Sequence, residues 1–190
     1  MEYNPYEQNR KSTRLDNYNY ATSGIYFITI CTKQGEYLFG DIKDGKMNYT
    51  PQGLIADIHI GMLKRLNHNI VDVEYVVMPN HIHLLITYVN DLADEKEFDI
   101  YNHDSRSMRE IRREDKKGES ISSVLRNLKS GITRDCHRLN YDMAWLNRFH
   151  DYVVRNNREQ ELIRCYIRNN PSQWDTQKNM DPLEEKWEEG

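Results

Sequence analysis

Apolar residues in the first part of the chain gather in short runs rich in β-branched and aromatic side chains. The runs at 24–33 (GIYFITICTK) and 36–42 (EYLFGDI) are separated by Gln34-Gly35, which predicts a β-hairpin. Asp44-Gly45 predicts a further turn before the run at 46–50 (KMNYT). This part of the chain therefore indicates strands joined by tight turns.

A second pair of apolar runs, IVDVEYVVM at 70–78 and HIHLLITYV at 81–89, is interrupted only by Pro79-Asn80. A break of two residues between strand-like runs predicts an antiparallel hairpin. Two histidines open its second strand. The run at 145–156 (WLNRFHDYVVRN) predicts one more short and irregular strand.

Three segments show helical spacing of their apolar residues. The first begins at Thr50-Pro51, an N-cap followed by a first-turn proline, and should end near 67–69. The second covers 121–136. The third begins at Asn157, which forms a capping box with Gln160, and stops at Asn169-Asn170-Pro171. The positions expected to face the core are Leu54, Ile55, Ile58, Met62, Leu63 and Leu66 in the first helix, Ile121, Val124, Leu125, Leu128, Ile132 and Cys136 in the second, and Leu162, Ile163, Tyr166 and Ile167 in the third.

The alternation of several antiparallel strands with two or three helices predicts an α+β fold. We expect a central antiparallel β-sheet with helices packed on it, covering one face. Charged and polar residues dominate 90–119, which predicts an insertion outside the core. We expect one domain over 1–175 that includes this insertion, followed by an acidic tail at 176–190.

Composition and charge narrow the class of protein. No apolar run is long enough to cross a bilayer, and the polar start of the chain carries no apolar signal segment, so we expect a soluble, cytoplasmic protein. Three cysteines without a Cys-x-x-Cys pair argue against a disulfide framework and a structural zinc site. The formal net charge is −4, yet the segment 108–138 is locally positive. Phosphates would suit that segment, and a solvated helix face explains it equally well.

His81 and His83 are two residues apart in a predicted strand, so their side chains should project from the same face. Such a pair either ligates one divalent ion or consists of ordinary polar residues on a solvated face. The apolar flanks indicate a largely buried strand, where unpaired imidazoles cost free energy, so a metal ion or a charged ligand is favoured. Two histidines suit an open site for Mg²⁺ or Mn²⁺, completed by a third side chain and a phosphate oxygen.

The segment VMPNHIHLLI resembles the HUH motif (histidine, hydrophobic, histidine) of the single-tyrosine transposases of bacterial insertion sequences. It is most similar to the REP-associated tyrosine transposases. The resemblance runs from YFITICTKQGEYLFGDI to RFHDYVVRNNREQELIRCYIRNNPSQW and so covers most of the chain. It implies an HUH transposase-like, ferredoxin-like sandwich. It also implies that His81, His83 and Asn170 ligate a divalent metal and that Tyr166 is the nucleophile.

The spacing of Tyr166 and Asn170, four residues apart, places both on one helical face and so agrees with these roles. By the resemblance, Tyr166 attacks a DNA phosphate and forms a 5′-phosphotyrosine link with a free 3′-OH, which is nicking followed by strand transfer. Without the resemblance Tyr166 is one of thirteen tyrosines and reads as a core or rim residue. Tyr152 is its nearest rival.

The resemblance implies single-stranded DNA with hairpins, such as repetitive extragenic palindromes, as the substrate. Trp145 and Phe149 fit core packing better than base stacking. Two other functions stay open, a domesticated DNA-hairpin-binding protein with little or no cleavage and a metal-dependent hydrolase. Monomer and homodimer also both stay open. The candidates for contacts with the DNA backbone are Arg10, Lys11 and Arg14 near the start of the chain and Arg126, Lys129 and Arg134 on the second helix.

Overall fold

The computed structural model of the protein describes residues 22–89 and 120–174. The predicted insertion at 90–119, the acidic tail at 176–190 and the candidates Arg10, Lys11 and Arg14 lie outside the described residues. In chain order the elements are β1 (Gly24–Cys31), the 3₁₀ turn η1 (Lys33–Gly35), β2 (Gly40–Lys43), β3 (Lys46–Tyr49), α2 (Pro51–Gly61), α3 (Leu63–Leu66), β4 (Ile70–Val77), β5 (His81–Tyr88), α5 (Ile121–Arg138), β6 (His150–Val154) and α6 (Asn157–Gln173).

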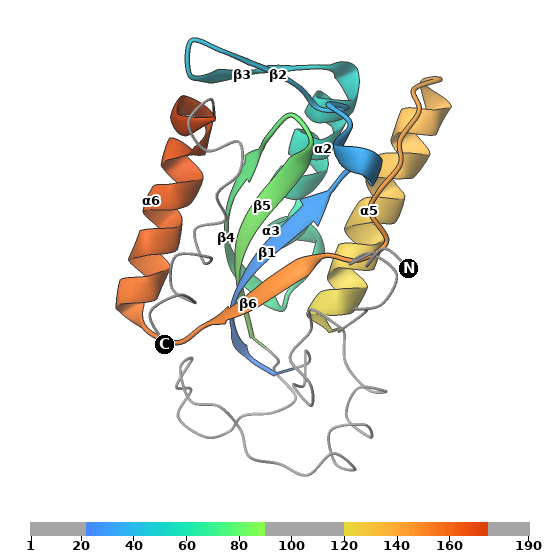
Figure 1. Ribbon diagram of the computed structural model, residues 1–190. Helices are drawn as coiled ribbons and strands as arrows, with labels where there is room; N and C mark the ends of the chain where they lie inside the picture. Colours follow the sequence, from blue (N-terminus) through green and yellow to red (C-terminus); the bar gives the residue numbers. More distant parts are fainter. Residues whose placement is uncertain (1–21, 90–119, 175–190) are drawn as a thin grey trace, which may run out of the picture.

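Four strands form the central sheet in the order β4-β5-β1-β6, and all neighbouring pairs are antiparallel (Figure 1). The predicted α+β fold is therefore confirmed. The predicted hairpin around Pro79-Asn80 is also confirmed, because the amide of Met78 donates to the carbonyl of His81 at 2.8 Å where β4 turns into β5. The strand predicted within 145–156 is β6.

The predicted hairpin between 24–33 and 36–42 is wrong. β1 pairs with β5 along one edge and with β6 along the other, so it offers no edge to the segment that follows it. Gln34 and Gly35, both with positive φ, turn the chain in η1, and Phe39 then enters the core. β2 pairs instead with β3 across the Asp44-Gly45 turn, where the sequence predicted a turn.

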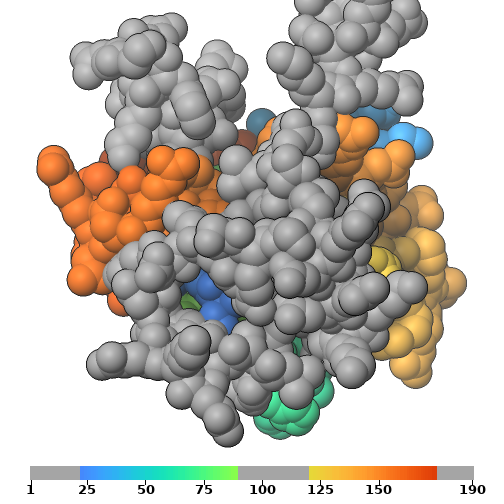
Figure 2. Space-filling model, turned by 90° about the horizontal axis from the view of Figure 1, so that it is seen from below, coloured from blue at the N-terminus to red at the C-terminus, as the bar shows by residue number. Residues whose placement is uncertain are grey.

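Helices cover both faces of the sheet, so the expectation of a single covered face is wrong. Alternate β1 side chains pack in two separate clusters, because both sets are apolar. Tyr26 and Ile28 share a cluster with residues of α2, α3 and α5, while Ile25 and Phe27 share the other with residues of α6. In Figure 1, α5 and α6 stand on opposite sides of the sheet, and Figure 2 shows α6 (orange) and α5 (yellow) at opposite flanks of the molecule.

The first helix begins as predicted, because the Thr50 hydroxyl accepts from the amide of Gly53 at 3.1 Å. It breaks at Met62 into α2 and α3. Its predicted apolar face is wrong in part, since Leu63 is buried but Leu54, Ile58 and Leu66 are half or more exposed. In the first turns of α2 the small residues Gly53 and Ala56 are buried instead, because the helix lies close to the preceding chain. A side chain at Gly53 would collide with the carbonyl of Phe39. The buried positions of α2 and α3 are Gly53, Ala56, Ile60 and Leu63.

The second helix, α5, buries all six predicted apolar positions. It packs closely against α2, because a Cβ at Gly131 would lie 2.9 Å from Cε1 of His59. A hydrogen bond of 2.8 Å between His59 Nε2 and Asp135 Oδ2 joins the two helices. Close packing at a glycine and a buried apolar stripe together fix α5 on its face of the sheet.

The third helix, α6, begins at Asn157 as predicted, with its N-cap one residue earlier than predicted, and it ends later than predicted. Asn156 is the N-cap, and its side-chain oxygen accepts from the amide of Glu159 at 2.9 Å. The predicted stop is wrong because the helix continues through Pro171 to Gln173. A proline removes only its own N–H from the helical ladder, and the Ser172 hydroxyl donates to the carbonyl of Asn169 at 2.8 Å. Trp174 therefore directly follows the helix.

Candidate active site

The two histidines lie on the face of the sheet that α6 covers. In the β1–β5 register, His83 is opposite Thr29 and His81 is opposite Cys31. His83 is buried at 5% exposure, and His81 is partly buried. Their Nε2 atoms are 3.1 Å apart. The predicted common direction of the two side chains is therefore confirmed, and their ring nitrogens converge on one point.

Hydrogen bonds to the outer ring nitrogens orient both imidazoles. Asn80 donates through Nδ2 to the carbonyl of Gly35 at 3.3 Å, which leaves its Oδ1 to accept from Nδ1 of His81 at 2.7 Å. Nε2 of neutral His81 then carries a lone pair. Nδ1 of His83 lies 2.8 Å from the Thr29 hydroxyl, which serves either tautomer because it donates or accepts. Histidines that ligate a metal through one ring nitrogen are usually held by such a hydrogen bond at the other ring nitrogen.

Burial holds both imidazoles in the neutral form. It lowers the pKa of His81 to about 4. Burial, and after it the neighbouring His81, lowers the pKa of His83 well below its ordinary value. A neutral imidazole is the form that binds a metal ion, so at neutral pH the pair is ready to bind a cation without first losing a proton.

Tyr166 reaches this pair from α6 of the same chain. Its hydroxyl lies 3.1 Å from Nε2 of His83, and its ring meets the His83 ring edge to face at 5.2 Å between centroids. Phe27 stacks on His83 at 5.3 Å and contacts Tyr166 edge to face at 6.1 Å. The structure thus brings together residues 83 positions apart, with Phe27 packed against both rings.

Asn170 lies between Tyr166 in α6 and Trp174 directly after it, two residues that contact the histidines. Positions 166, 170 and 174 follow one another by a helical turn each, so they share one face. Tyr166 contacts His83, and the ring of Trp174 lies 5.9 Å from that of His81. Asn170 is only 3% exposed. It is therefore buried on the same helix face as the two residues that contact the histidines.

Ion pairs fix α6 to the edge strand β4. Arg168 Nε lies 2.6 Å from Glu74 Oε1, Arg164 Nε lies 3.5 Å from Glu74 Oε2, and Arg164 Nη2 lies 3.3 Å from Asp72 Oδ2. The Glu74 side chain is only 21% exposed, so these pairs are partly shielded from solvent. They add to the apolar contacts of Ile163 and Ile167 in holding Tyr166 at its place.

The rival tyrosine, Tyr152, has a structural environment. Its hydroxyl donates to Glu159 Oε2 at 2.9 Å, and Glu159 also accepts from the amide of Arg155 at 3.0 Å. Burial, followed by that hydrogen bond, raises the pKa of Tyr152 to about 12. Tyr152 therefore links β6 to the start of α6. His150, at the start of β6, is exposed.

The basic candidates on α5 lie on the other face of the sheet. Arg126, Lys129 and Arg134 line a pocket there and are not brought together with the histidines. Trp145 and Phe149 are partly buried against the core, in agreement with the predicted core packing, and they also line this pocket.

Sequence reasoning missed the residues that support the histidine pair. Thr29 and Phe27 belong to β1, and only the register of β1 with β5 shows that they face His83. Trp174 was missed because the helix was predicted to stop at Pro171. Asn80 had a visible signal, since an amide directly before the first histidine is within reach of its ring.

The residues present fit a divalent cation. Within 22–89 and 120–174 no cluster of three or more His, Cys, Asp and Glu side chains is present. A third protein ligand from the described residues would therefore be of another type, and Asn170 is a buried side chain with a carboxamide oxygen on the helix face that contacts the histidines. Two imidazole nitrogens and a neutral oxygen leave positions for substrate oxygens, and such a donor set suits Mn²⁺ or Mg²⁺.

Comparison with known proteins gives a likeness in sequence and one in structure. The chain is 30% identical over 184 residues to an uncharacterized protein of Haemophilus influenzae, and the match covers 91% of this chain and 94% of that protein. A solved structure of a REP-associated tyrosine transposase bound to a REP hairpin is similar with a TM-score of 0.50 and 19% identity, over 80% of this chain and 68% of that one. No protein-family model matches the chain.

The structural likeness establishes the fold. The four-stranded antiparallel sheet with helices packed on it matches the HUH transposase fold. Among the described helices, none is long and apolar enough to span a membrane.

Proposed function

The chain belongs to the same family as the Haemophilus influenzae protein and has the fold of a REP-associated tyrosine transposase, and from this premise we propose that it nicks and rejoins single-stranded DNA through a covalent link to Tyr166. One observation carries the proposal. The Tyr166 hydroxyl lies 3.1 Å from Nε2 of His83, which itself lies 3.1 Å from Nε2 of His81. A phenol oxygen and two neutral imidazoles thus meet at one buried point.

His81, His83 and Asn170 would hold Mg²⁺ or Mn²⁺, which when bound supplies Lewis-acid polarisation of the scissile phosphate. Asn80 and Thr29 orient the two rings from behind, and Trp174 packs beside His81. These three residues contribute by position, because each fixes a ligand or excludes water rather than contacting the reacting phosphate.

Tyr166 supplies the nucleophile. Its oxygen forms a bond to phosphorus, and the bond from phosphorus to the 3′ oxygen breaks. The phenol loses its proton, and the departing 3′ oxygen takes one up as a hydroxyl. The strand on the 3′ side of the nick stays on Tyr166 through its 5′ phosphate. Because the phosphodiester bond is exchanged rather than hydrolysed, a 3′-OH can later reverse the step and join strands.

The substrate we propose is DNA that contains a hairpin next to a single strand. This proposal is supported by the structural relative, which is described as bound to a REP hairpin. The presence of His81, His83, Tyr166 and Asn170 together favours cleavage over a pure DNA-binding role, because binding alone requires none of the four.

The test uses a hairpin oligonucleotide with a single-stranded flank, labelled at its 3′ end, incubated with the full-length protein and Mn²⁺. We expect a protein–DNA adduct that survives denaturing electrophoresis, and Tyr166→Phe should lose it by at least a hundredfold. A 5′ label should appear instead on a free fragment that ends in a 3′-OH.

Tyr152→Phe is the matched control, since it makes the same change on the same face of the sheet and should keep the adduct. An adduct that persists in Tyr166→Phe would show that Tyr166 is not the nucleophile. Hairpin binding by the wild-type protein without any adduct would exclude nicking under these conditions and favour a binding role.

A further inference from the structure

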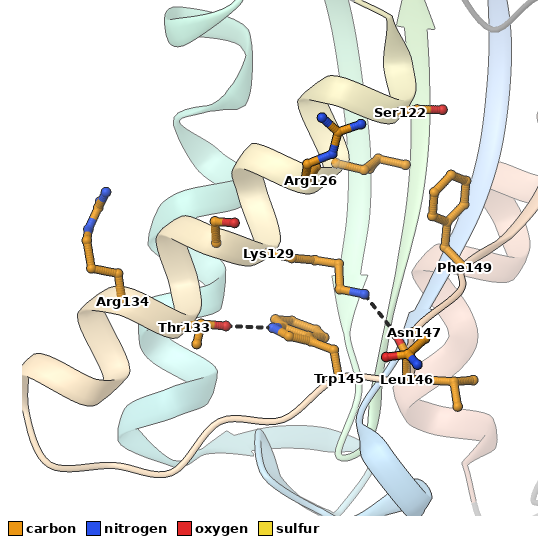
Figure 3. Close-up of a pocket in the computed structure, with 11 residues that line it drawn as sticks. Ser122, Arg126, Lys129, Thr133, Arg134, Trp145, Leu146, Asn147 and Phe149 are labelled. Carbon is orange, nitrogen blue, oxygen red and sulfur yellow. Dashed lines mark hydrogen bonds between the residues drawn. The ribbon is translucent and has the colours of Figure 1, made fainter.

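A pocket of about 640 Å³ lies between α5 and the chain that leads into β6 (Figure 3). This volume is within the range of about 300–1,000 Å³ that small-molecule sites occupy. It can therefore take a nucleotide but not a duplex. The pocket is lined by Ser122, Leu125, Arg126, Lys129, Ser130, Thr133, Arg134, Trp145, Leu146, Asn147 and Phe149.

The lining favours an anion. It contains three basic residues, Arg126, Lys129 and Arg134, and no acidic one. Within the described residues Arg126 makes no ion pair, and Arg134 pairs only with its neighbour Asp135. Lys129 Nζ donates to the carbonyl of Leu146 at 2.9 Å, and burial lowers its pKa. The Leu146 carbonyl is neutral and so does not balance the charge of this half-buried ammonium. A phosphate would supply the opposite charge.

The lining also favours a planar group beside that anion. Trp145 and Phe149 come from the segment that faces α5 across the pocket, the Trp145 ring points toward α5, and Lys129 Nζ is 5.6 Å from the centre of that ring. Trp145 is held in place because its Nε1 donates to the Thr133 hydroxyl at 2.9 Å. Basic side chains, two aromatic rings and several hydroxyl or amide groups form the combination that binds a phosphate together with a base.

The pocket meets the catalytic strands at one end. The amide of Leu146 donates to the carbonyl of Cys31 at 2.9 Å, and Cys31 is paired with His81 in the β1–β5 register. Leu146, which lines the pocket, therefore lies beside the C-terminal end of β1, and the neighbouring strand at that end carries His81.

We propose that this pocket binds one unpaired nucleotide of the substrate strand, with its phosphate at Lys129 and Arg126 and its base against Phe149 and Trp145. The inference rests on the proposed function in one respect, that single-stranded DNA is the substrate. It adds a second contact, on the opposite face of the sheet from Tyr166, that holds the strand while Tyr166 acts.

Affinity for a fluorescein-labelled single-stranded oligonucleotide tests the charge contacts, measured by anisotropy in EDTA so that no cleavage occurs. We expect Lys129→Gln and Arg126→Gln each to raise Kd about tenfold and to reduce the slope of log Kd against log salt by about 0.7. Arg126 is exposed, so its replacement leaves the fold intact even if that of Lys129 does not.

Arg138→Gln is the matched control. It removes the same charge from the same helix, but its side chain is 76% exposed and does not line the pocket, so Kd should stay within twofold. If Arg138→Gln and Arg126→Gln raise Kd equally, the effect of charge on DNA affinity is diffuse and the proposal is overturned. A duplex that binds as tightly as the single strand would also overturn the proposal.

Photocrosslinking with 5-iododeoxyuridine in the strand tests the base contact, and the crosslinked peptide should contain Trp145 or Phe149. Performing this in Tyr166→Phe separates the two proposals. A crosslink in the pocket without any wild-type adduct would support the pocket and contradict nicking. A normal adduct with unchanged Kd in Arg126→Gln and Lys129→Gln would support nicking and contradict the pocket.

Discussion

At the scale of single residues, the neutral state of the two histidines depends on their surroundings. The face of the sheet under α6 has few polar groups. Around His83 the neighbours are the Phe27 ring, the Thr29 hydroxyl, the Tyr166 hydroxyl and His81. Burial among such groups keeps the imidazoles neutral. The sequence was sufficient to predict the histidine pair, because the period of a strand fixes their common direction. It was not sufficient to predict the contact between Thr29 and His83, because that contact depends on the register between β1 and β5.

Asn80 tests the residue-scale account. Its side-chain oxygen fixes the tautomer of His81, so Asn80→Ala should weaken Mn²⁺ binding by about tenfold or more, as replacements behind metal-ligating histidines usually do. Electron paramagnetic resonance titration of the DNA-free protein measures this. Asn127→Ala on the exposed side of α5 should bind Mn²⁺ like the wild type. Equal affinity of Asn80→Ala and wild type would contradict the role assigned to Asn80.

At the scale of elements, local pattern predicted where most strands and helices lie but not always how they pair. The hairpin at Pro79-Asn80 was predictable because its two strands are neighbours in both sequence and sheet. β1 was assigned to the wrong partner because its true partners, β5 and β6, follow it by about 50 and 120 residues. The predicted helix stop at Pro171 and the predicted apolar face of α2 were wrong for a common reason. In both places tertiary packing overrides the local preference of the sequence.

Glu74 tests how α6 is held. It pairs with both Arg164 and Arg168, so Glu74→Gln should reduce the free energy of unfolding by about 1–2 kcal/mol and slow formation of the Tyr166 adduct. Mn²⁺ affinity should fall less than the adduct rate, because two of the three proposed ligands belong to β5 and only Asn170 belongs to α6. Urea denaturation and adduct kinetics measure the two effects.

Lys43→Ala is the control for this prediction, because its pair with Asp41 is exposed to solvent and its loss should leave the free energy of unfolding at the wild-type value. If Glu74→Gln leaves both stability and adduct rate at the wild-type values, the ion pairs do not position α6.

At the scale of the whole molecule, one sheet separates two sets of residues to which we assign a function. The histidines and Tyr166 lie under α6, and the basic pocket lies beside α5. Tyr166 contacts His83 of its own chain, which predicts that one chain is sufficient for cleavage. The match to the HUH transposase fold agrees with the fold that the sequence led us to expect.

Mixing two inactive variants tests whether one chain is sufficient. Tyr166→Phe keeps the histidines, and His83→Gln keeps the tyrosine, so a mixture would regain activity only if Tyr166 of one chain served the histidines of another. We expect no adduct from the mixture above the sum of the separate variants. Recovery to a quarter or more of wild-type activity would show that α6 exchanges between chains.

The central claim is that Tyr166 becomes covalently joined to DNA beside the histidine pair. Mass spectrometry of the trapped adduct, after nuclease and protease digestion, tests it most directly. The account predicts one modified peptide, containing Cys165 and Tyr166, with a nucleotide joined to Tyr166 through its 5′ phosphate, formed with Mn²⁺ and absent in EDTA. A nucleotide on Tyr152 or on any other residue, or an adduct of equal yield in EDTA, would contradict it.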